Sequence, residues 1–452
     1  MNAEALYKVV EERDARFAGR FFLGVRTTHI YCRPGCPAKT PRRENVEFFP
    51  SAAAAQSAGF RACMRCRPDA APGSAAEAGT SAVLSRALRL LEESGEAAGL
   101  ADRLGISDRH LRRLFAQHLG ASPAEVLRTR RLHLARQLLE TSSLPMIDVA
   151  LAAGFQSVRR FNDALREAFG RTPTELRSKP VAEHGLVLRL PFRQPLDFDR
   201  LLRFFAPRTL DGIEEVRDGA WRRTLREGVL EVRCGKDALE VRVPPVLAPQ
   251  ALQIAARVTR VFDLRADPRA IERHLAKDEL LKPFLRPGLR VPGAWDPFEM
   301  AVRAILGQQI TVAAARKLAN RIVFDYGETL PHGRLFPTPE NLASVELRGM
   351  PASRARSVAA LAQAVASGRV RLDGTQGPEA LLEVPGIGDW TAQLIALRAL
   401  GEPDAFPAAD LGLCQSMKLT PRELSARAEA WRPWRATAAA ALWLYSPDDQ
   451  KQ

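Results

Sequence analysis

Four of the six cysteines in this 452-residue chain fall in two close pairs near its start. Cys32 and Cys36 form the first pair, and Cys63 and Cys66 form the second. Two short-spaced pairs are typical of a tetrahedral zinc site, in which the metal keeps cysteine as the nucleophilic thiolate at neutral pH. The spacing predicts a Zn²⁺ cofactor and leaves open whether the site is reactive or purely structural.

A second group of residues that could do chemistry lies in the C-terminal third. Residues 381–392 have the pattern of helix, tight Pro-Gly-x-Gly turn and helix, with Gly386 and Gly388 in the turn. Such a turn leaves backbone N–H groups at a helix N-terminus, where they can bind phosphate. Asp410 ends an apolar segment further along the chain. At that position an aspartate could be a helix N-cap.

The stretch 81–177 has helical periodicity and contains an internal repeat of 50 residues. Residues 120–126 match residues 170–176, with glycine, proline and glutamate in register. Each copy has a helix-turn-helix pattern, in which Ser107 and Ser157 can cap the second helix. The outer faces of these helices offer arginines for DNA phosphates or base edges, namely Arg109, Arg112, Arg113, Arg159 and Arg160. A plain helical bundle with exposed arginines is the alternative.

The rest of the chain divides into a strand-rich and a helical part. Residues 186–190 and 239–243 alternate apolar and polar side chains and are expected to be strands, whereas residues 251–445 have a helical pattern. Asp296-Pro297-Phe298-Glu299 predicts a helix start with a capping box. Residues 68–80, rich in Ala, Gly, Ser and Pro, are expected to be a flexible linker.

A chain of this length requires several hydrophobic cores. We expect a multidomain, mainly α fold with four parts. They are a small four-cysteine zinc α+β domain (1–70), a double helix-turn-helix domain (80–178), a small α+β domain (184–288) and an all-helical domain (289–446).

The net charge of +14 is spread along the chain, because residues 1–80, 81–180 and 181–452 carry +4, +5 and +5. This distribution favours a polyanionic partner, such as DNA, that several domains contact. The sequence has neither a long apolar run nor a signal-peptide pattern at its start. We therefore expect a cytoplasmic, nucleoid-associated monomer with no membrane contact.

The sequence around the cysteines, residues 25–36 and 59–63, resembles the N-terminal domain of the Ada family over residues 1–68. The resemblance implies that Cys32 accepts a methyl group from a DNA phosphotriester and is a zinc ligand together with Cys36, Cys63 and Cys66. Methylation would remove one negative charge from the site and so strengthen DNA binding. Residues that stand where this family contacts the DNA backbone are Thr28, Lys39 and Arg61. Each of the three could equally be a solvated surface residue.

The repeated segment resembles the AraC family of transcription regulators over about 100 residues, including the run Gly154-Phe155-Gln156-Ser157. This resemblance implies sequence-specific binding to double-stranded DNA and transcription activation, with RNA polymerase as an expected partner.

Residues 184–445 resemble the 3-methyladenine DNA glycosylase II family of helix-hairpin-helix proteins, which implies a glycosylase fold for the helical domain. On that pattern Asp410 is catalytic, Gly386 and Gly388 bind DNA, and Trp390 and Trp443 line the base pocket. Trp390 also stands where bifunctional relatives carry a Schiff-base lysine, which implies a monofunctional hydrolase. The lesion preference stays open, because Gln309 replaces an apolar wedge residue and Leu394 replaces a pocket tyrosine.

The sequence thus predicts an alkylation-damage response protein that hydrolyses the N-glycosidic bond of bases such as 3-methyladenine, accepts phosphotriester methyl groups once per molecule on Cys32, and regulates transcription. It lacks the acceptor motif for O6-methylguanine repair. The alternative is a transcription regulator with a structural zinc site and a catalytically inactive glycosylase fold.

Overall fold

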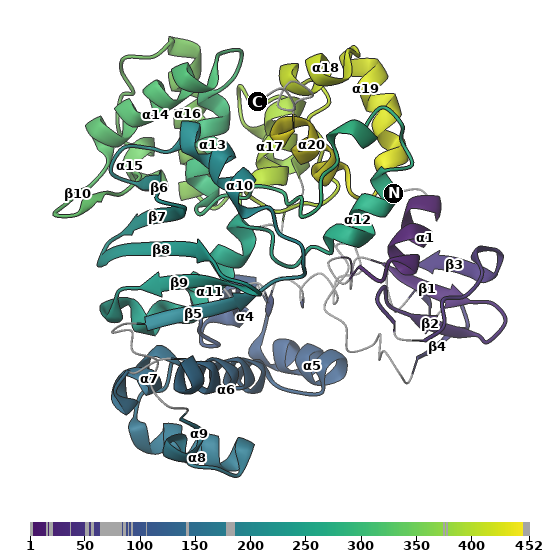
Figure 1. Cartoon of the computed structure of the whole chain (residues 1–452), viewed down its shortest axis with the longest axis vertical. Helices are drawn as coiled ribbons and strands as arrows, with labels where there is room; N and C mark the ends of the chain where they lie inside the picture. The colour runs from purple at the N-terminus through teal and green to yellow at the C-terminus, as the bar shows by residue number, and fades with distance from the viewer. Residues whose placement is uncertain are drawn as a thin grey trace. The chain divides into compact units, whose positions relative to one another are not determined.

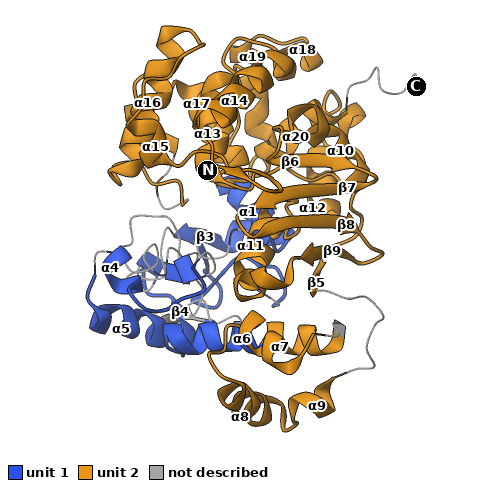
Figure 2. Ribbon diagram, turned by 90° about the vertical axis from the view of Figure 1, so that its left-hand side faces the viewer, with its two compact units in different colours: residues 1–133 blue, residues 134–452 orange. Residues whose placement is uncertain are grey.

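A computed structural model describes residues 3–14, 17, 21–36, 38–49, 54–55, 58–63, 84, 87–88, 90–91, 94–104, 106–141, 144–177, 186–373, 376 and 378–445. The chain forms two compact units, residues 1–133 and residues 134–452 (Figure 2). The whole of the expected linker, 68–80, and the expected fourth zinc ligand, Cys66, lie outside the described residues. Among the described helices, none is long and apolar enough to cross a membrane.

The first unit begins with a small α+β fold. A four-stranded sheet in the order β3-β1-β2-β4 lies beside a helix. Its core is aromatic, with Phe22, Tyr31, Phe49 and Phe60 in one cluster. Gly24 has no room for a side chain, because a Cβ there would lie 2.7 Å from the rings of Phe49 and Phe60. The elements are α1 (Ala3–Glu11), β1 (Phe22–Val25), β2 (Ile30–Cys32), η2 (Arg43–Asn45), β3 (Val46–Phe49) and β4 (Arg61–Ala62).

The two helix-turn-helix copies keep the predicted register. Helices α5 (Asp108–Leu119) and α8 (Val158–Phe169) are equally long, and Ser107 and Ser157 cap them by accepting a backbone N–H bond. Gly120 and Gly170 then end both helices in the left-handed conformation that glycine adopts most easily. The remaining helices of this segment are α4 (Leu100–Leu104), α6 (Pro123–Thr141), α7 (Met146–Ala152) and α9 (Pro173–Leu176).

A five-stranded antiparallel sheet follows in the second unit, in the order β5-β9-β8-β7-β6 (Figure 1). The two predicted strands are its neighbours β5 and β9, where Leu188 pairs with Val241. Helices α10 and α11 pack near it around the buried ring of Phe262, which contacts Phe198 and Trp221. The elements are β5 (Leu186–Pro191), α10 (Phe198–Phe205), η4 (Ala206–Arg208), β6 (Glu214–Arg217), β7 (Ala220–Leu225), β8 (Gly228–Cys234), β9 (Ala238–Val243), η5 (Pro245–Gln250), α11 (Ala251–Val261), α12 (Pro268–Leu275) and η6 (Lys282–Phe284).

The C-terminal part is helical, as predicted, and is built around α13 (Pro297–Leu306), of which eight residues are buried. It also contains a short hairpin, β10 (Thr329–Leu330) and β11 (Gly333–Arg334), that the periodicity did not predict. The other helices are α14 (Val312–Tyr326), α15 (Pro339–Ala343), α16 (Ala352–Ala366), η7 (Pro378–Glu383), α17 (Asp389–Arg398), α18 (Leu411–Met417), α19 (Pro421–Ala428), η8 (Glu429–Trp431) and α20 (Arg435–Leu444). The predicted multidomain, mainly α architecture is confirmed.

The start of α13 corrects one detail of the sequence interpretation. Asp296 caps the helix, with its Oδ1 accepting a bond from the Glu299 N–H at 2.8 Å. The Glu299 carboxylate, however, pairs with the guanidinium groups of Arg223 and Arg303, so the predicted capping box is wrong. Burial alone would raise the pKa of Glu299, but the two arginines hold it lowered overall. A buried tertiary ion pair therefore replaces the local bond.

Candidate functional site

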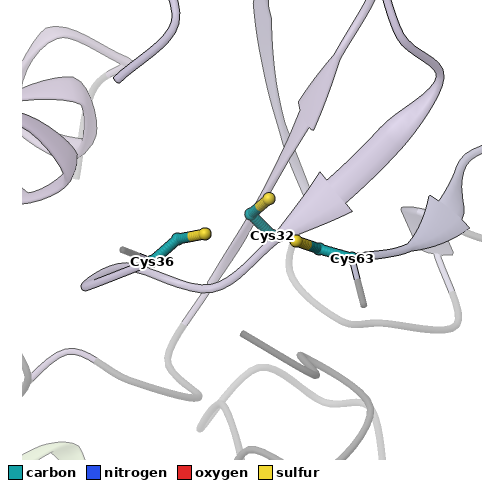
Figure 3. Close-up of side chains that lie close together, drawn as sticks. All are labelled: Cys32, Cys36 and Cys63. Carbon is teal, nitrogen blue, oxygen red and sulfur yellow. The ribbon is translucent and has the colours of Figure 1, made fainter. Parts of the chain in front are cut away.

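Strand pairing brings the cysteines together at one edge of the N-terminal sheet. Strands β2 and β4 run parallel, and the N–H of Cys63 donates to the carbonyl of Tyr31 at 3.0 Å, beside Cys32. Cys36 comes from the turn that follows β2, where its N–H donates to the carbonyl of Arg33. The three sulfurs all lie within 4.8 Å of one another, and in Figure 3 the side chain of Cys32 lies between those of Cys36 and Cys63.

This cluster fits a zinc ion. Tetrahedral zinc at about 2.3 Å from each sulfur places neighbouring sulfurs about 3.8 Å apart, which is within the observed spacing. Cys32 and Cys63 are each 7% exposed, and Cys36 is half-buried. Three of the four predicted ligands are therefore brought together.

The predicted backbone contacts of the zinc domain are all exposed side chains. Thr28 lies in the turn between β1 and β2, and Arg61 begins β4, where its N–H donates to the carbonyl of His29 at 2.8 Å. Both residues therefore lie near the start of β2. Lys39 lies in a segment held to α1, because Tyr7 donates to the carbonyl of Pro41 at 2.7 Å. A contact of these residues with DNA stays a prediction.

The predicted recognition helices expose their arginines. Arg109, Arg112 and Arg113 are exposed on α5, whereas Leu111, Leu114 and Phe115 of the same helix are buried. On α8, Arg159 and Arg160 are exposed, and Phe161 and Leu165 are buried. This division suits a helix that presents its basic face to DNA, and the roles of the individual arginines stay predictions.

Asp410 lies where three helices converge. It caps α18, because Oδ1 accepts a bond from the N–H of Leu413 at 3.2 Å. The indole N–H of Trp390, on α17, donates to Oδ2 at 3.1 Å, and that of Trp443, on α20, donates to Oδ1 at 3.2 Å. The alternative role of Asp410 as a helix N-cap is therefore present, and its catalytic role stays a prediction that is compatible with the partly exposed position of the carboxylate between two tryptophans.

This arrangement suits electrostatic catalysis. Three N–H donors fix the orientation of the carboxylate, so its negative charge is preorganised to face a developing positive charge and to orient a water molecule. Both tryptophans are half-buried and bonded to Asp410, which makes them supports of the carboxylate as well as predicted walls of a base pocket.

An arginine that the sequence interpretation missed lies beside this carboxylate. The Arg208 guanidinium stacks 3.8 Å from the ring centre of Phe204, and that ring lies 6.4 Å from the ring of Trp443. The pKa of Arg208 is lowered to about 10, mainly by burial and further by repulsion from Arg303, while attraction to Asp410 opposes this shift. No local pattern marks this residue, because the fold brings the sheet domain and the C-terminal helices together at this point.

The predicted hairpin precedes α17. Gly386 has a φ of 86°, and a Cβ there would lie 1.8 Å from Oγ of Ser357, so glycine is required. Gly388 is the N-cap of α17 and has no side chain with which to cap the helix. The first N–H groups of α17 thus suit a phosphate, and DNA binding by Gly386 and Gly388 stays a prediction.

The two departures from the family pattern lie in different surroundings. Gln309 is exposed in the turn between α13 and α14 and has a φ of 56°. Leu394 is partly buried and packs against the hydrophobic core of the helical domain. The residue before Gln309, Gln308, was not among the predicted site residues, although its side chain donates to the carbonyl of Gly386 in the hairpin.

Four family models match the chain. The metal binding domain of Ada matches residues 5–69, a helix-turn-helix domain matches residues 100–179, and the AlkA N-terminal domain matches residues 187–296. The model of the HhH-GPD superfamily of base excision DNA repair proteins matches residues 302–423. These matches confirm the predicted resemblances, and with the cysteine cluster they confirm Zn²⁺ as the cofactor.

Curated relatives cover the same parts. The chain is 42% identical to the probable bifunctional transcriptional activator/DNA repair enzyme AlkA of Mycobacterium tuberculosis, over 97% of this chain and 96% of the relative. It is 34% identical to the DNA-3-methyladenine glycosylase 2 of Escherichia coli, over 58% of this chain and 99% of the relative. It is 36% identical to the bifunctional transcriptional activator/DNA repair enzyme Ada of Escherichia coli, over 38% of this chain and 48% of the relative.

Proposed function

The chain belongs to the family of bifunctional transcriptional activator/DNA repair enzyme AlkA proteins, and on that premise we propose that it excises alkylated bases such as 3-methyladenine and accepts phosphotriester methyl groups on Cys32. The chain is a DNA repair glycosylase fused to a DNA-binding regulator with a zinc domain. Double-stranded DNA, alkylated or carrying an operator, is the proposed partner.

The observation that carries the glycosylase proposal is the carboxylate of Asp410 held by Trp390 and Trp443. Hydrolysis breaks the bond between C1′ of the sugar and the base nitrogen, and the electron pair leaves with the base. Asp410 would stabilise the positive charge that develops on the sugar and orient the water that attacks C1′. Trp390 stands where a Schiff-base lysine would be required for strand cleavage, so the proposed enzyme is monofunctional.

The two indole rings would also bind the base. An alkylated purine with a positive charge can stack on tryptophan by cation–π attraction. The N–H bonds to Asp410 fix the ring edges, so the same contacts that orient the carboxylate also fix the walls of the pocket.

For the zinc domain, we propose transfer of a methyl group from a DNA phosphotriester to Sγ of Cys32. The carbon–oxygen bond breaks, a carbon–sulfur bond forms, and the DNA is left with an ordinary phosphodiester. Zinc, held by Cys32, Cys36, Cys63 and, by proposal, Cys66, would keep the sulfur as thiolate. The step consumes the acceptor, so each molecule acts once. Thr28, Lys39 and Arg61 would hold the DNA backbone.

The helix-turn-helix segment supports a regulatory role. Arg109, Arg112 and Arg113 of α5, with Arg159 and Arg160 of α8, are proposed to contact operator DNA. We further propose that the chain acts as a monomer that activates transcription through RNA polymerase. Loss of negative charge on methylation of Cys32 would strengthen its grip on DNA.

Two measurements on the zinc-loaded full chain test these proposals. Incubation with methylated duplex DNA should release free 3-methyladenine and 7-methylguanine, detected by chromatography, without strand cleavage. Incubation with DNA carrying a methylphosphotriester should add one methyl group to the peptide that contains Cys32, detected by mass spectrometry. If no base is released, the catalytically inactive alternative is correct, and if no methyl adduct forms, the zinc site is structural.

A further inference from the structure

The turn between α13 and α14 holds an unusual backbone conformation. Gln309 has a φ of 56°, in the left-handed region that side-chain-bearing residues seldom adopt, and its side chain is exposed. Such a conformation persists only where the surrounding structure fixes it. The contacts of the preceding residue, Gln308, provide that restraint.

The side chain of Gln308 ties this turn to the hairpin. Its Nε2 donates to the carbonyl of Gly386 at 3.0 Å and to Oγ1 of Thr391 at 2.9 Å, so both of its N–H groups are used. The guanidinium of Arg354, near the start of α16, donates to the backbone carbonyl of Gln308. The turn is therefore attached to the hairpin, to α17 and to α16 through one residue.

The hairpin is a firm anchor for this attachment. Gly386 is packed against Ser357 so closely that no side chain fits, and the N–H of Ile387 donates to the carbonyl of Val384 at 3.1 Å. Thr391 is 2% exposed. The two atoms that accept bonds from the Gln308 amide, the Gly386 carbonyl and Thr391 Oγ1, are thus fixed in position. These bonds therefore restrict the movement of the turn that contains Gln309.

We propose that Gln308 is a positioning residue that holds the Gln309 turn in a fixed place relative to the hairpin of Gly386 and Gly388. The hairpin would bind the DNA backbone while the Gln309 turn takes part in base extrusion. This inference rests on the proposed glycosylase function. A base must leave the stack before its glycosidic bond can be reached, which costs stacking and pairing energy. Gln309, at the position of the family's wedge residue, would offset that cost by occupying the vacated space while the hairpin binds the DNA backbone. If the turn moved independently, binding at the hairpin would displace the turn rather than the base.

The test compares a paired lesion with an unpaired one. Gln308→Met keeps a similar length and removes both N–H donors. Single-turnover release of 7-methylguanine is measured from a duplex with cytosine opposite and from a duplex with an abasic analogue opposite, where extrusion costs less. Gln308→Met should slow release about 10-fold or more from the paired duplex and less than about 3-fold from the unpaired one.

Two further variants complete this experiment. Thr391→Val is nearly isosteric and removes one of the two acceptors, so it should show a smaller selective loss and should fold even if Gln308→Met does not. Gln376→Met is the matched control, because the Gln376 side chain also makes two hydrogen bonds, to Arg371 and Arg369, and it should leave both rates unchanged.

Equal slowing on both duplexes, or no slowing on either, by the folded Gln308 and Thr391 variants would overturn the positioning role. Failure of the wild-type chain to release base from either duplex would instead overturn the proposed glycosylase function. The two failures are therefore distinguishable.

Discussion

The indole nitrogen of Trp390 lies 3.1 Å from Oδ2 of Asp410, although 20 residues separate the two in sequence. Trp443 makes the equivalent bond to Oδ1 from a second helix. The carboxylate is therefore oriented by tertiary structure, and its reactivity should depend on both donors.

Trp390→Phe keeps an aromatic wall and removes the donor. A hydrogen bond to a charged group contributes about 1.5–3 kcal/mol, so base release should slow by about 10- to 100-fold. Trp431→Phe is the matched control, because it removes an indole bond to a different carboxylate, that of Asp278, and should leave the rate per folded molecule unchanged. Single-turnover release from methylated DNA measures both, and equal rates for Trp390→Phe and wild type would contradict the orienting role.

Removal of zinc should unfold the N-terminal domain and spare base release. A domain of about 70 residues buries only a small hydrophobic core, so its stability should depend on the metal that joins β2 to β4. A chelator should make residues 1–70 sensitive to limited proteolysis and release one zinc ion per chain. Persistence of the protected fragment after complete zinc removal would contradict the prediction.

The buried ion pair between Glu299 and Arg223 joins β7 to α13, and their side chains are 4% and 6% exposed. Glu299→Gln should lower the unfolding free energy by about 3 kcal/mol, since it removes one of the two carboxylates that neutralise the buried Arg223 and Arg303, the other being that of Glu214. The control is Glu328→Gln, which breaks an exposed pair with Arg226 and should cost no more than about 1 kcal/mol. Urea unfolding followed by tryptophan fluorescence reports on the second unit alone, because all six tryptophans lie there. Equal losses for the two variants would contradict this account.

Asp278 provides a pH-dependent contribution to stability. Burial alone would raise its pKa, but bonds from Arg427, Trp431 and the backbone lower it overall. Because the folded pKa lies below the unfolded value, the stabilisation is complete above about pH 4 and is lost as the pH falls through the folded pKa. Asp278→Asn should therefore cost about 1–2 kcal/mol at pH 7 and progressively less below pH 4. Urea unfolding across this range measures it, and a difference that does not change with pH would argue against a charged Asp278.

Local rules predicted the repeated parts of the fold well. Ser107 and Ser157 cap their helices as predicted, because a cap depends only on the next three residues. The spacing of apolar residues likewise predicted which sides of α5 and α8 are buried. The same kind of local rule was wrong for Glu299. It predicted a capping box, but the Glu299 carboxylate binds Arg223, which lies on a distant strand. The two tryptophan bonds to Asp410, the place of Arg208 and the bonds of Gln308 likewise join distant segments, and no spacing in the sequence encodes them.

The most direct test of the central claim is single-turnover release of methylated purines by wild type and by Asp410→Asn, both as zinc-loaded full chains. Asparagine is as good an N-cap as aspartate, so α18 should remain folded and urea unfolding should change little. We predict that release falls by about 100-fold or more, as expected when the charge that stabilises the sugar cation is lost. Release by Asp410→Asn at the wild-type rate would contradict the assignment of Asp410 as the catalytic residue.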